Sequence, residues 1–234
     1  MATQQKFWSI NAQGKQASVD LFGIVGDPGY WDEGTGDNSA AGFIRSLRAL
    51  GKGITTLNVN IYSEGGSVWD GLAIYRALVD FPAEKVVHVT SLSASIASVI
   101  MLAGDKIEVA PEAVVMIHNP WGIAMGDEKD MADYAARLHT AKDRILNIYE
   151  RRTGQNREHL SDLMDAETWF ASGEEIKAAG FADSVKADMP KSRIAAGPLT
   201  MAAHWKHVPD SVIHRKPQPV APEVAARMQK LGIV

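Results

Sequence analysis

The sequence predicts an α/β fold whose strands pair mainly in parallel. Short β-type runs alternate with segments of helical periodicity from about residue 19 to residue 180, an order typical of parallel sheets covered by helices. The 234 residues are 46% hydrophobic and 22% charged, an ordinary globular composition that supplies one sizeable core. Fibrous, collagen-like and wholly disordered classes are therefore excluded.

Four short runs predict the strands. In residues 56–62, three apolar residues alternate with Asn58 and Asn60, which is the period of a strand with one buried face. The other runs lie at residues 19–25, 85–90 and 114–118.

Four segments predict helices. Apolar residues recur at helical spacing in residues 68–79, and Pro82 follows the end of that helix. Residues 96–103 are apolar on all sides, as in a buried helix, up to Gly104. The remaining two are a long amphipathic helix at 127–152 and a shorter helix at 174–179.

The chain divides near residue 186. Residues 1–186 carry all the predicted strands and these four helices, whereas residues 187–234 hold six of the ten prolines. We interpret residues 187–234 as an extended proline-rich tail with one short helix at 223–231. Such a tail is compatible with no role at all or with a docking or propeptide role.

Composition excludes several function classes. A net charge of −4 gives no general attraction to nucleic acid or anionic lipid. With no cysteine, disulfides, cysteine nucleophiles and thiolate metal sites are excluded, and no pair of histidines has the spacing of a metal site. No apolar run approaches the roughly 20 residues of a membrane span, and the first residues do not resemble a signal peptide. We expect a cytoplasmic protein with neither membrane nor nucleic acid as partner, and no metal.

Three places carry residue types suited to catalysis. The turn at 63–66 ends in two glycines, whose amides can face a developing oxyanion. Ser93, Ser95 and Ser98 lie among small residues where a strand enters a buried helix, and any of them could be a nucleophile. His118 ends an apolar strand, where a general base can be held. Each also has a plain structural interpretation, as a tight turn, a small residue at a close contact or a buried histidine.

Residues 17–186 resemble the ClpP-type serine peptidases, and within them the ClpP-like head maturation proteases of phages and prophages. The glycine motif is similar to residues 61–68, although Glu64 stands where the housekeeping enzymes usually have proline. The nucleophile motif is similar to residues 91–98, which makes Ser95 the nucleophile, and the base motif to residues 116–120, which makes His118 the base. Four motifs in the expected order, including the long helix and its end, make the resemblance specific.

The third member of the triad departs from the family pattern. The family has an aspartate two residues before a phenylalanine, and here Thr168 lies two residues before Phe170. Thr168 could orient the histidine through its hydroxyl, and Glu167 or Asp165 could substitute for the aspartate. Loss of the acid costs about 10⁴ in rate in other serine hydrolases, so a slow peptidase and an inactive one are both compatible with the sequence.

The resemblance implies further properties of the fold, mechanism and partners. The fold would be of the ClpP/crotonase type, with repeated ββα units and a projecting handle helix, and the chains would assemble into a homo-oligomeric ring. The amides of Gly66 and Ile96 would form the oxyanion hole, and the chemistry would need no cofactor. Substrates would be peptides or proteins, with capsid or scaffold proteins expected in the phage branch, and an AAA+ unfoldase would be a possible partner.

Alternatives to this interpretation remain open. A crotonase-like enzyme acting on coenzyme A thioesters would share the glycine-rich oxyanion hole but would not need both Ser95 and His118. A serine–lysine dyad would use Lys106, the nearest lysine after Ser95. A third alternative is a ring subunit that has lost catalysis and acts in assembly, with Thr168 as the sign of that loss.

Overall fold

A central sheet organises the structure, a computed structural model that describes residues 6–26, 39–188 and 207–208. In this part of the chain eight strands form one sheet in the order β1-β2-β3-β4-β5-β8, with β6 beside β4 and β7 beside β6. Strands β1 and β7 are antiparallel to their neighbours, and the other pairings are parallel. The strands are β1 (Trp8–Gln13), β2 (Gln16–Val25), β3 (Thr56–Gly66), β4 (Glu84–Ala94), β5 (Lys106–Val109), β6 (Val114–Ile117), β7 (Thr168–Phe170) and β8 (Ser184–Val185).

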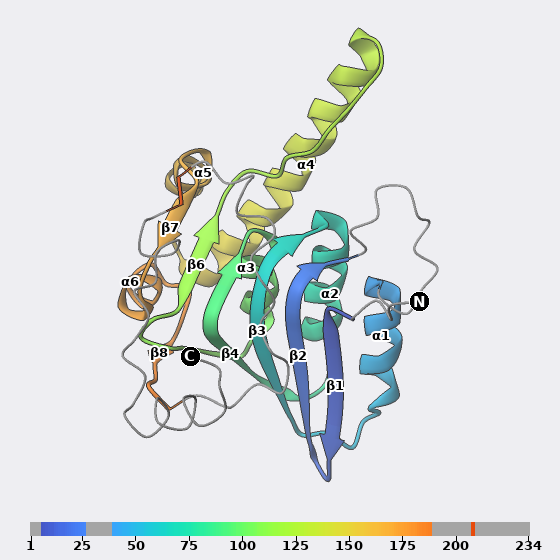
Figure 1. Ribbon diagram of the computed structural model, residues 1–234, viewed down its shortest axis with the longest axis vertical. Coiled ribbons are helices and arrows are strands. Elements are labelled where there is room, and N and C mark those ends of the chain that lie inside the picture. The colour runs from blue at the N-terminus through green and yellow to red at the C-terminus, as the bar shows by residue number, and fades with distance from the viewer. Residues whose placement is uncertain (1–5, 27–38, 189–206, 209–234) are drawn as a thin grey trace, which may run out of the picture.

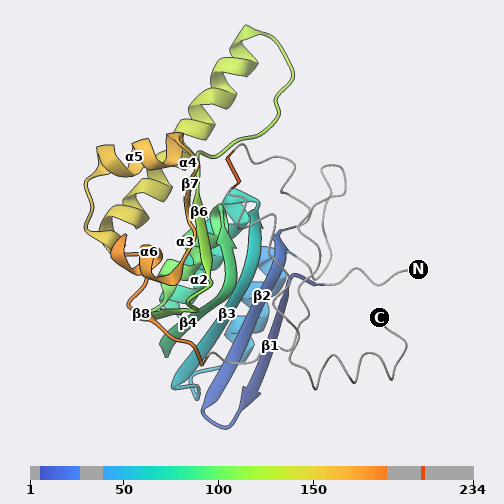
Figure 2. The ribbon, with the colours of Figure 1, turned by 60° about the vertical axis from the view of Figure 1, so that its left-hand side comes forward.

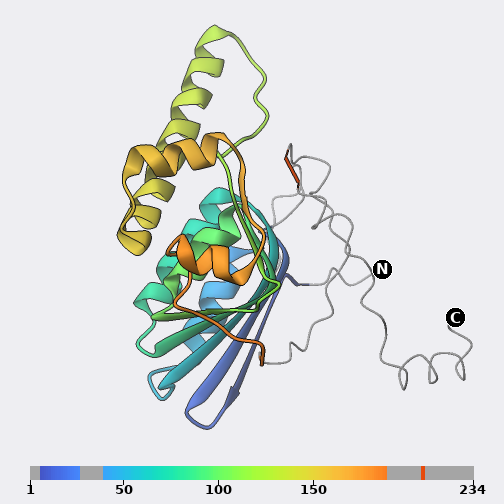
Figure 3. The same ribbon diagram turned by 90° about the vertical axis from the view of Figure 1, so that its left-hand side faces the viewer.

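Helices cover one side of this sheet and extend beyond it. The blue to green helices, α1 (Ala40–Ala49), α2 (Val68–Asp80) and α3 (Ile96–Ile100), all lie on the same side, with a short 3₁₀ turn after α3 (Figure 3). The long helix α4 (Glu128–Thr153) projects away from the sheet (Figures 1 and 2). It is followed by α5 (Arg157–Asp165) and α6 (Gly173–Ala178).

The ends of α4 explain its length. Asp127 and Asp130 form a reciprocal capping box at its start, and Gly154 takes the left-handed conformation (φ 68°) that ends it. Only the C-terminal half of α4 buries side chains, among them Ile145 and Tyr149. The first half is therefore a solvent-facing projection, because it has no core to bury against.

Strand β4 divides into two pairing regions. Its residues 86–89 pair with β5, whereas Leu92, Ser93 and Ala94 pair with Val114, Val115 and Met116 of β6. The sheet therefore splits at its C-terminal edge, and the ends of β4 and β6 lie side by side.

The α/β class, the mainly parallel pairing and the expected strands and helices are confirmed by this architecture. Strand β1, helices α1 and α5, and the short strands β5, β7 and β8 were not predicted from sequence. Most of residues 187–234, including the expected helix at 223–231, lies outside the described residues.

The sheet face opposite α1–α3 carries a polar row followed by an apolar patch. Strand register aligns Ser9, Asp20, Asn60, His88, Glu108 and Ser184 across the sheet. The Asp20 carboxylate accepts from the Asn60 amide (2.7 Å) and from the Ser9 hydroxyl (3.0 Å), which satisfies a charge that is 2% exposed. Towards the ends of β4 and β6 the same face becomes apolar.

Candidate active site

Ser95 occupies a strained turn between β4 and α3. Its φ and ψ are 55° and −129°, a conformation that non-glycine residues seldom adopt. The Ser95 amide donates to the Met116 carbonyl of β6 at 2.9 Å, so the turn is fixed to the neighbouring strand. The side chain makes no hydrogen bond to the start of α3 and is half-buried. The turn therefore presents the hydroxyl away from the helix that it begins.

His118 reaches the Ser95 hydroxyl from the end of β6. The distance from His118 Nε2 to Ser95 Oγ is 2.7 Å, a hydrogen bond with the geometry of a nucleophile and its base. Pairing of residues 92–94 with residues 114–116 brings together two residues that are 23 positions apart. Desolvation lowers the pKa of His118, and the charge of Glu167 partly opposes that shift. A neutral imidazole is the form that can accept the serine proton.

The glycine turn lies directly against Ser95. Gly65 and Gly66 have φ values of 93° and 146°, which side chains rarely permit. A Cβ atom on Gly65 would be 2.6 Å from Ser95 Cβ, and one on Gly66 would be 2.2 Å from the Val25 carbonyl oxygen. Both positions therefore require glycine for backbone contact, and the turn that the sequence predicted as an oxyanion site borders Ser95.

A buried hydroxyl pair supports the nucleophile turn from below. The Ser98 hydroxyl contacts the Ser95 carbonyl and lies 2.7 Å from the Tyr149 hydroxyl of α4. Burial raises the pKa of Tyr149 well above its usual range, so the phenol stays protonated. This link between the long helix and the turn was missed from sequence, because Tyr149 is 51 positions from Ser98 and looks like any residue of an amphipathic face.

Thr168 faces away from His118. Its hydroxyl donates to the Leu163 carbonyl of α5 at 2.7 Å, and no hydrogen bond joins it to His118 within the described residues. The register of β6 and β7 pairs Ile117 with Thr168 and Met116 with Trp169. Because neighbours on a strand point to opposite faces, Thr168 shares a face with Ile117 rather than with His118.

Glu167 lies on the His118 side of the sheet. Continuing the β6–β7 register by one residue sets it opposite His118, and facing residues of an antiparallel pair share a face. Its φ is 51° and it is 8% exposed. Oε1 accepts from the His207 amide at 2.9 Å and from the Trp169 indole at 3.4 Å.

Asp165 and Lys106 are engaged away from the serine. Asp165 is exposed and accepts from the Asn119 amide (2.6 Å) and from Lys142 of α4 (2.7 Å). Lys106 pairs with Glu108 at 2.7 Å, on the part of β5 that lies beside residues 86–89 of β4. The serine–lysine dyad is therefore not assembled in this structure.

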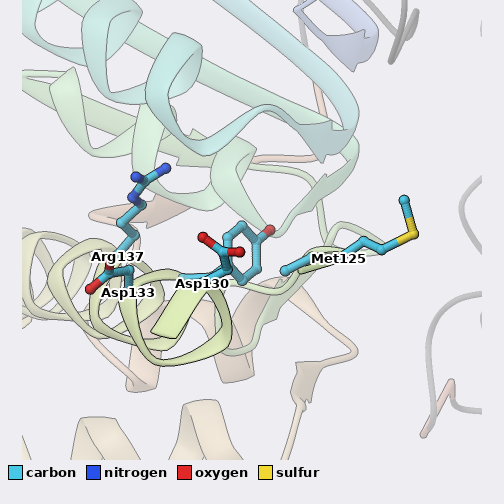
Figure 4. A pocket seen from close by; sticks show the side chains of 6 residues that line it. Met125, Asp130, Asp133 and Arg137 are labelled. Atoms are coloured by element: carbon cyan, nitrogen blue, oxygen red, sulfur yellow. The ribbon is translucent and has the colours of Figure 1, made fainter. Parts of the chain in front are cut away.

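A hollow in the described part of the chain is lined by neither Ser95 nor His118. It lies at the start of α4 and is lined by Ala124, Met125, Asp130, Asp133, Tyr134 and Arg137. Figure 4 shows Asp130, Asp133 and Arg137 on the helix, with Met125 extending from the loop before it.

Within the described residues, no group of three or more His, Asp and Glu side chains could hold a metal ion. In the same part of the chain, no helix is long and apolar enough to cross a bilayer.

Comparison with known proteins shows the family of this chain. A family model described as Clp protease matches residues 32–189, more than half of the chain. The chain belongs to the Clp protease family. It is 36% identical over 132 residues to "ATP-dependent Clp protease proteolytic subunit 1" of Gloeobacter violaceus, a match that spans 56% of this chain and 66% of that protein. It is 32% identical over 165 residues to the protein of the same name from Chlamydia abortus, over 67% of this chain and 84% of that protein.

Proposed function

We propose that this Clp family chain is a serine endopeptidase in which Ser95 is the nucleophile and His118 the general base. The hydrogen bond of 2.7 Å between His118 Nε2 and Ser95 Oγ carries the proposal. Ser95 Oγ attacks the scissile carbonyl while its proton passes to His118 Nε2. The C–N bond then breaks, the amine leaves with that proton, and an acyl-enzyme remains. Water, deprotonated by His118, hydrolyses the ester and restores the free serine.

Preset backbone donors would stabilise the tetrahedral oxyanion. We assign this role to the amides of Gly66 and Ile96, which belong to the glycine turn and to the first residue after Ser95. The contact of the glycine turn with Ser95 supports the assignment, since both segments border the point of attack. The strained φ of Ser95 supports it too, because such strain is retained where a site needs a fixed geometry.

We propose Glu167 as the residue that positions His118. Glu167 lies opposite His118 by register, and its charge raises the pKa of the imidazole, whereas the hydroxyl of Thr168 is bonded to α5. Thr168 and Asp165, the two other residues expected for this role, remain alternatives that substitution can separate. Loss of activity in Glu167→Gln, with activity retained in Thr168→Val and Asp165→Asn, would support Glu167.

Protein substrates and a ring assembly are part of the proposal. The names of the relatives describe proteolytic subunits of an ATP-dependent protease, which supports a homo-oligomeric ring that works alone or with an AAA+ unfoldase. The narrower assignment, cleavage of capsid or scaffold proteins in phage head maturation, has its support in the sequence resemblance to the phage branch. Degradation of unfolded protein without any ATPase would favour the self-contained form.

Labelling with a serine-directed fluorophosphonate tests the assignment of Ser95. Intact mass should show one adduct on the wild-type chain and none on Ser95→Ala. Ser93→Ala is a matched control, since it removes a hydroxyl two residues away and should keep the adduct. No adduct on the assembled wild-type protein would instead favour an assembly subunit without catalysis. Binding of a coenzyme A thioester would favour a crotonase-like enzyme.

A further inference from the structure

An apolar patch lies beside the nucleophile on the sheet face opposite α1–α3. Leu92 and Ala94 of β4 and Val114 and Met116 of β6 form its buried floor. Ala94 is the residue directly before Ser95, and Met116 is two residues before His118. The patch is bordered by two half-buried aromatic side chains, Tyr62 and Trp169. Any group bound here would therefore lie next to the reacting atoms.

Two residues from the C-terminal region occupy this patch. Val208 packs on its floor together with Tyr62 and Trp169. The preceding residue, His207, donates its backbone amide to Glu167 Oε1 at 2.9 Å. The orange-red segment of residues 207–208 lies where β6 and β7 run together, on the side away from α1–α3 (Figures 2 and 3). An apolar side chain and a backbone amide thus anchor the segment at adjacent points.

The His207 contact also joins the segment to Glu167, the residue opposite His118 by register. Glu167 and His118 face each other across β6 and β7, but Oε1 of Glu167 accepts from His207 and from Trp169. Release of His207 would therefore remove a donor from the carboxylate that lies opposite His118 by register.

We propose that residues 207–208 form an intramolecular latch that blocks the Ser95–His118 site by filling the apolar patch, with the His207 amide anchored on Glu167. The proposal rests on the proposed peptidase function. When the latch opens, the patch becomes available to an aliphatic side chain of a peptide substrate. Residues 207–208 of this chain are therefore the occupant of the patch in the resting state.

The rate of fluorophosphonate labelling at Ser95 in the full-length chain tests the latch. Val208→Asp places a charge on the apolar floor and should raise the rate about three- to tenfold, the range expected from loss of a partly buried valine contact. His207→Pro removes the amide donor and should also label faster than His207→Ala, which retains that amide. Val79→Asp, the same change at an exposed position of α2, should match the wild type.

The labelling results distinguish a failure of the latch proposal from a failure of the peptidase proposal. Equal labelling of Val208→Asp, His207→Pro and the wild type would overturn the latch and leave the peptidase intact. Slower labelling of the two latch variants would overturn it as well. No labelling of any variant would mean that the peptidase proposal fails, and docking would then be decided by a measurement that needs no activity.

Thiol accessibility supplies that measurement, because the chain has no cysteine of its own. Val208→Cys should react with a maleimide several-fold more slowly than Val79→Cys, whose position is 38% exposed on α2. In the double variant Val114→Asp/Val208→Cys, the charge in the floor of the patch should raise the maleimide rate at position 208 to that of Val79→Cys. Equal rates for the two single-cysteine chains would refute docking whatever the activity.

Discussion

The link between Ser98 and Tyr149 gives the sharpest energetic prediction. Ser98 and Tyr149 are 0% and 1% exposed, and their hydroxyls lie 2.7 Å apart. The Ser95 carbonyl can only accept, so the Ser98 hydroxyl donates to it and accepts from the Tyr149 phenol. Ser98→Ala would leave a buried phenol proton without its acceptor. We expect the free energy of unfolding to fall by about 1–3 kcal/mol.

The double variant measures the hydrogen bond itself. Tyr149→Phe alone leaves the Ser98 hydroxyl donating to Ser95, so we expect a smaller loss, about 0.5–1.5 kcal/mol. In Ser98→Ala/Tyr149→Phe the unsatisfied phenol is gone, and the loss should be smaller than the sum of the two single losses by about 1 kcal/mol or more.

Urea denaturation at pH 7 and fixed protein concentration is the assay. A tyrosine phenol is neutral at this pH even at its ordinary pKa, and burial raises the pKa of Tyr149 further, so its proton is present as a donor in every measurement. Ser93→Ala is the control, since Ser93 is equally buried and its hydroxyl has no partner within the described residues. If the loss of unfolding free energy in the double variant equalled the sum of the two single losses within about 0.5 kcal/mol, the predicted coupling between Ser98 and Tyr149 would be refuted.

Three further predictions concern the site. Desolvation lowers the pKa of His118, so the rate of Ser95 labelling should fall with decreasing pH only below about pH 6.5, the ordinary pKa of histidine. If this acid limb of the pH–rate profile lay above pH 6.5, the argument that burial lowers the pKa of His118 would be contradicted. Glu167→Gln removes an anion that raises this pKa, so the limb should move to still lower pH while the maximal rate falls. Gly65→Ala should abolish labelling, since its Cβ would lie 2.6 Å from Ser95 Cβ. Gly14→Ala, also at positive φ (62°) but with nothing within 4 Å, should cost only about 1 kcal/mol of stability and keep labelling.

Local patterns in the sequence were sufficient for the fold class. The alternation in residues 56–62 and the helical spacing in residues 68–79 are set by burial of one face, and both elements occur where expected. Strand β1 and helix α1 were not predicted. Short edge strands and helices such as these depend more on the surface they pack against than on their own pattern.

For the site, the sequence supplied the identities and the tertiary structure supplied the partners. Ser95 and His118 were chosen from motifs, and their contact follows from the pairing of β4 with β6. The third member of the triad shows what sequence alignment alone could not decide. A difference of one residue moves a side chain to the other face of β7, which sends Thr168 to α5 and sets Glu167 opposite His118.

The sequence by itself determined the α/β class, the family motifs and the residue types available for catalysis, because these depend on spacings of a few residues. Only the tertiary structure decided the support of the Ser95 turn by Tyr149 through Ser98 and the packing of Val208 on the apolar patch. Those contacts join residues far apart in the chain, and register and packing between distant segments are fixed by the whole core rather than by any local pattern.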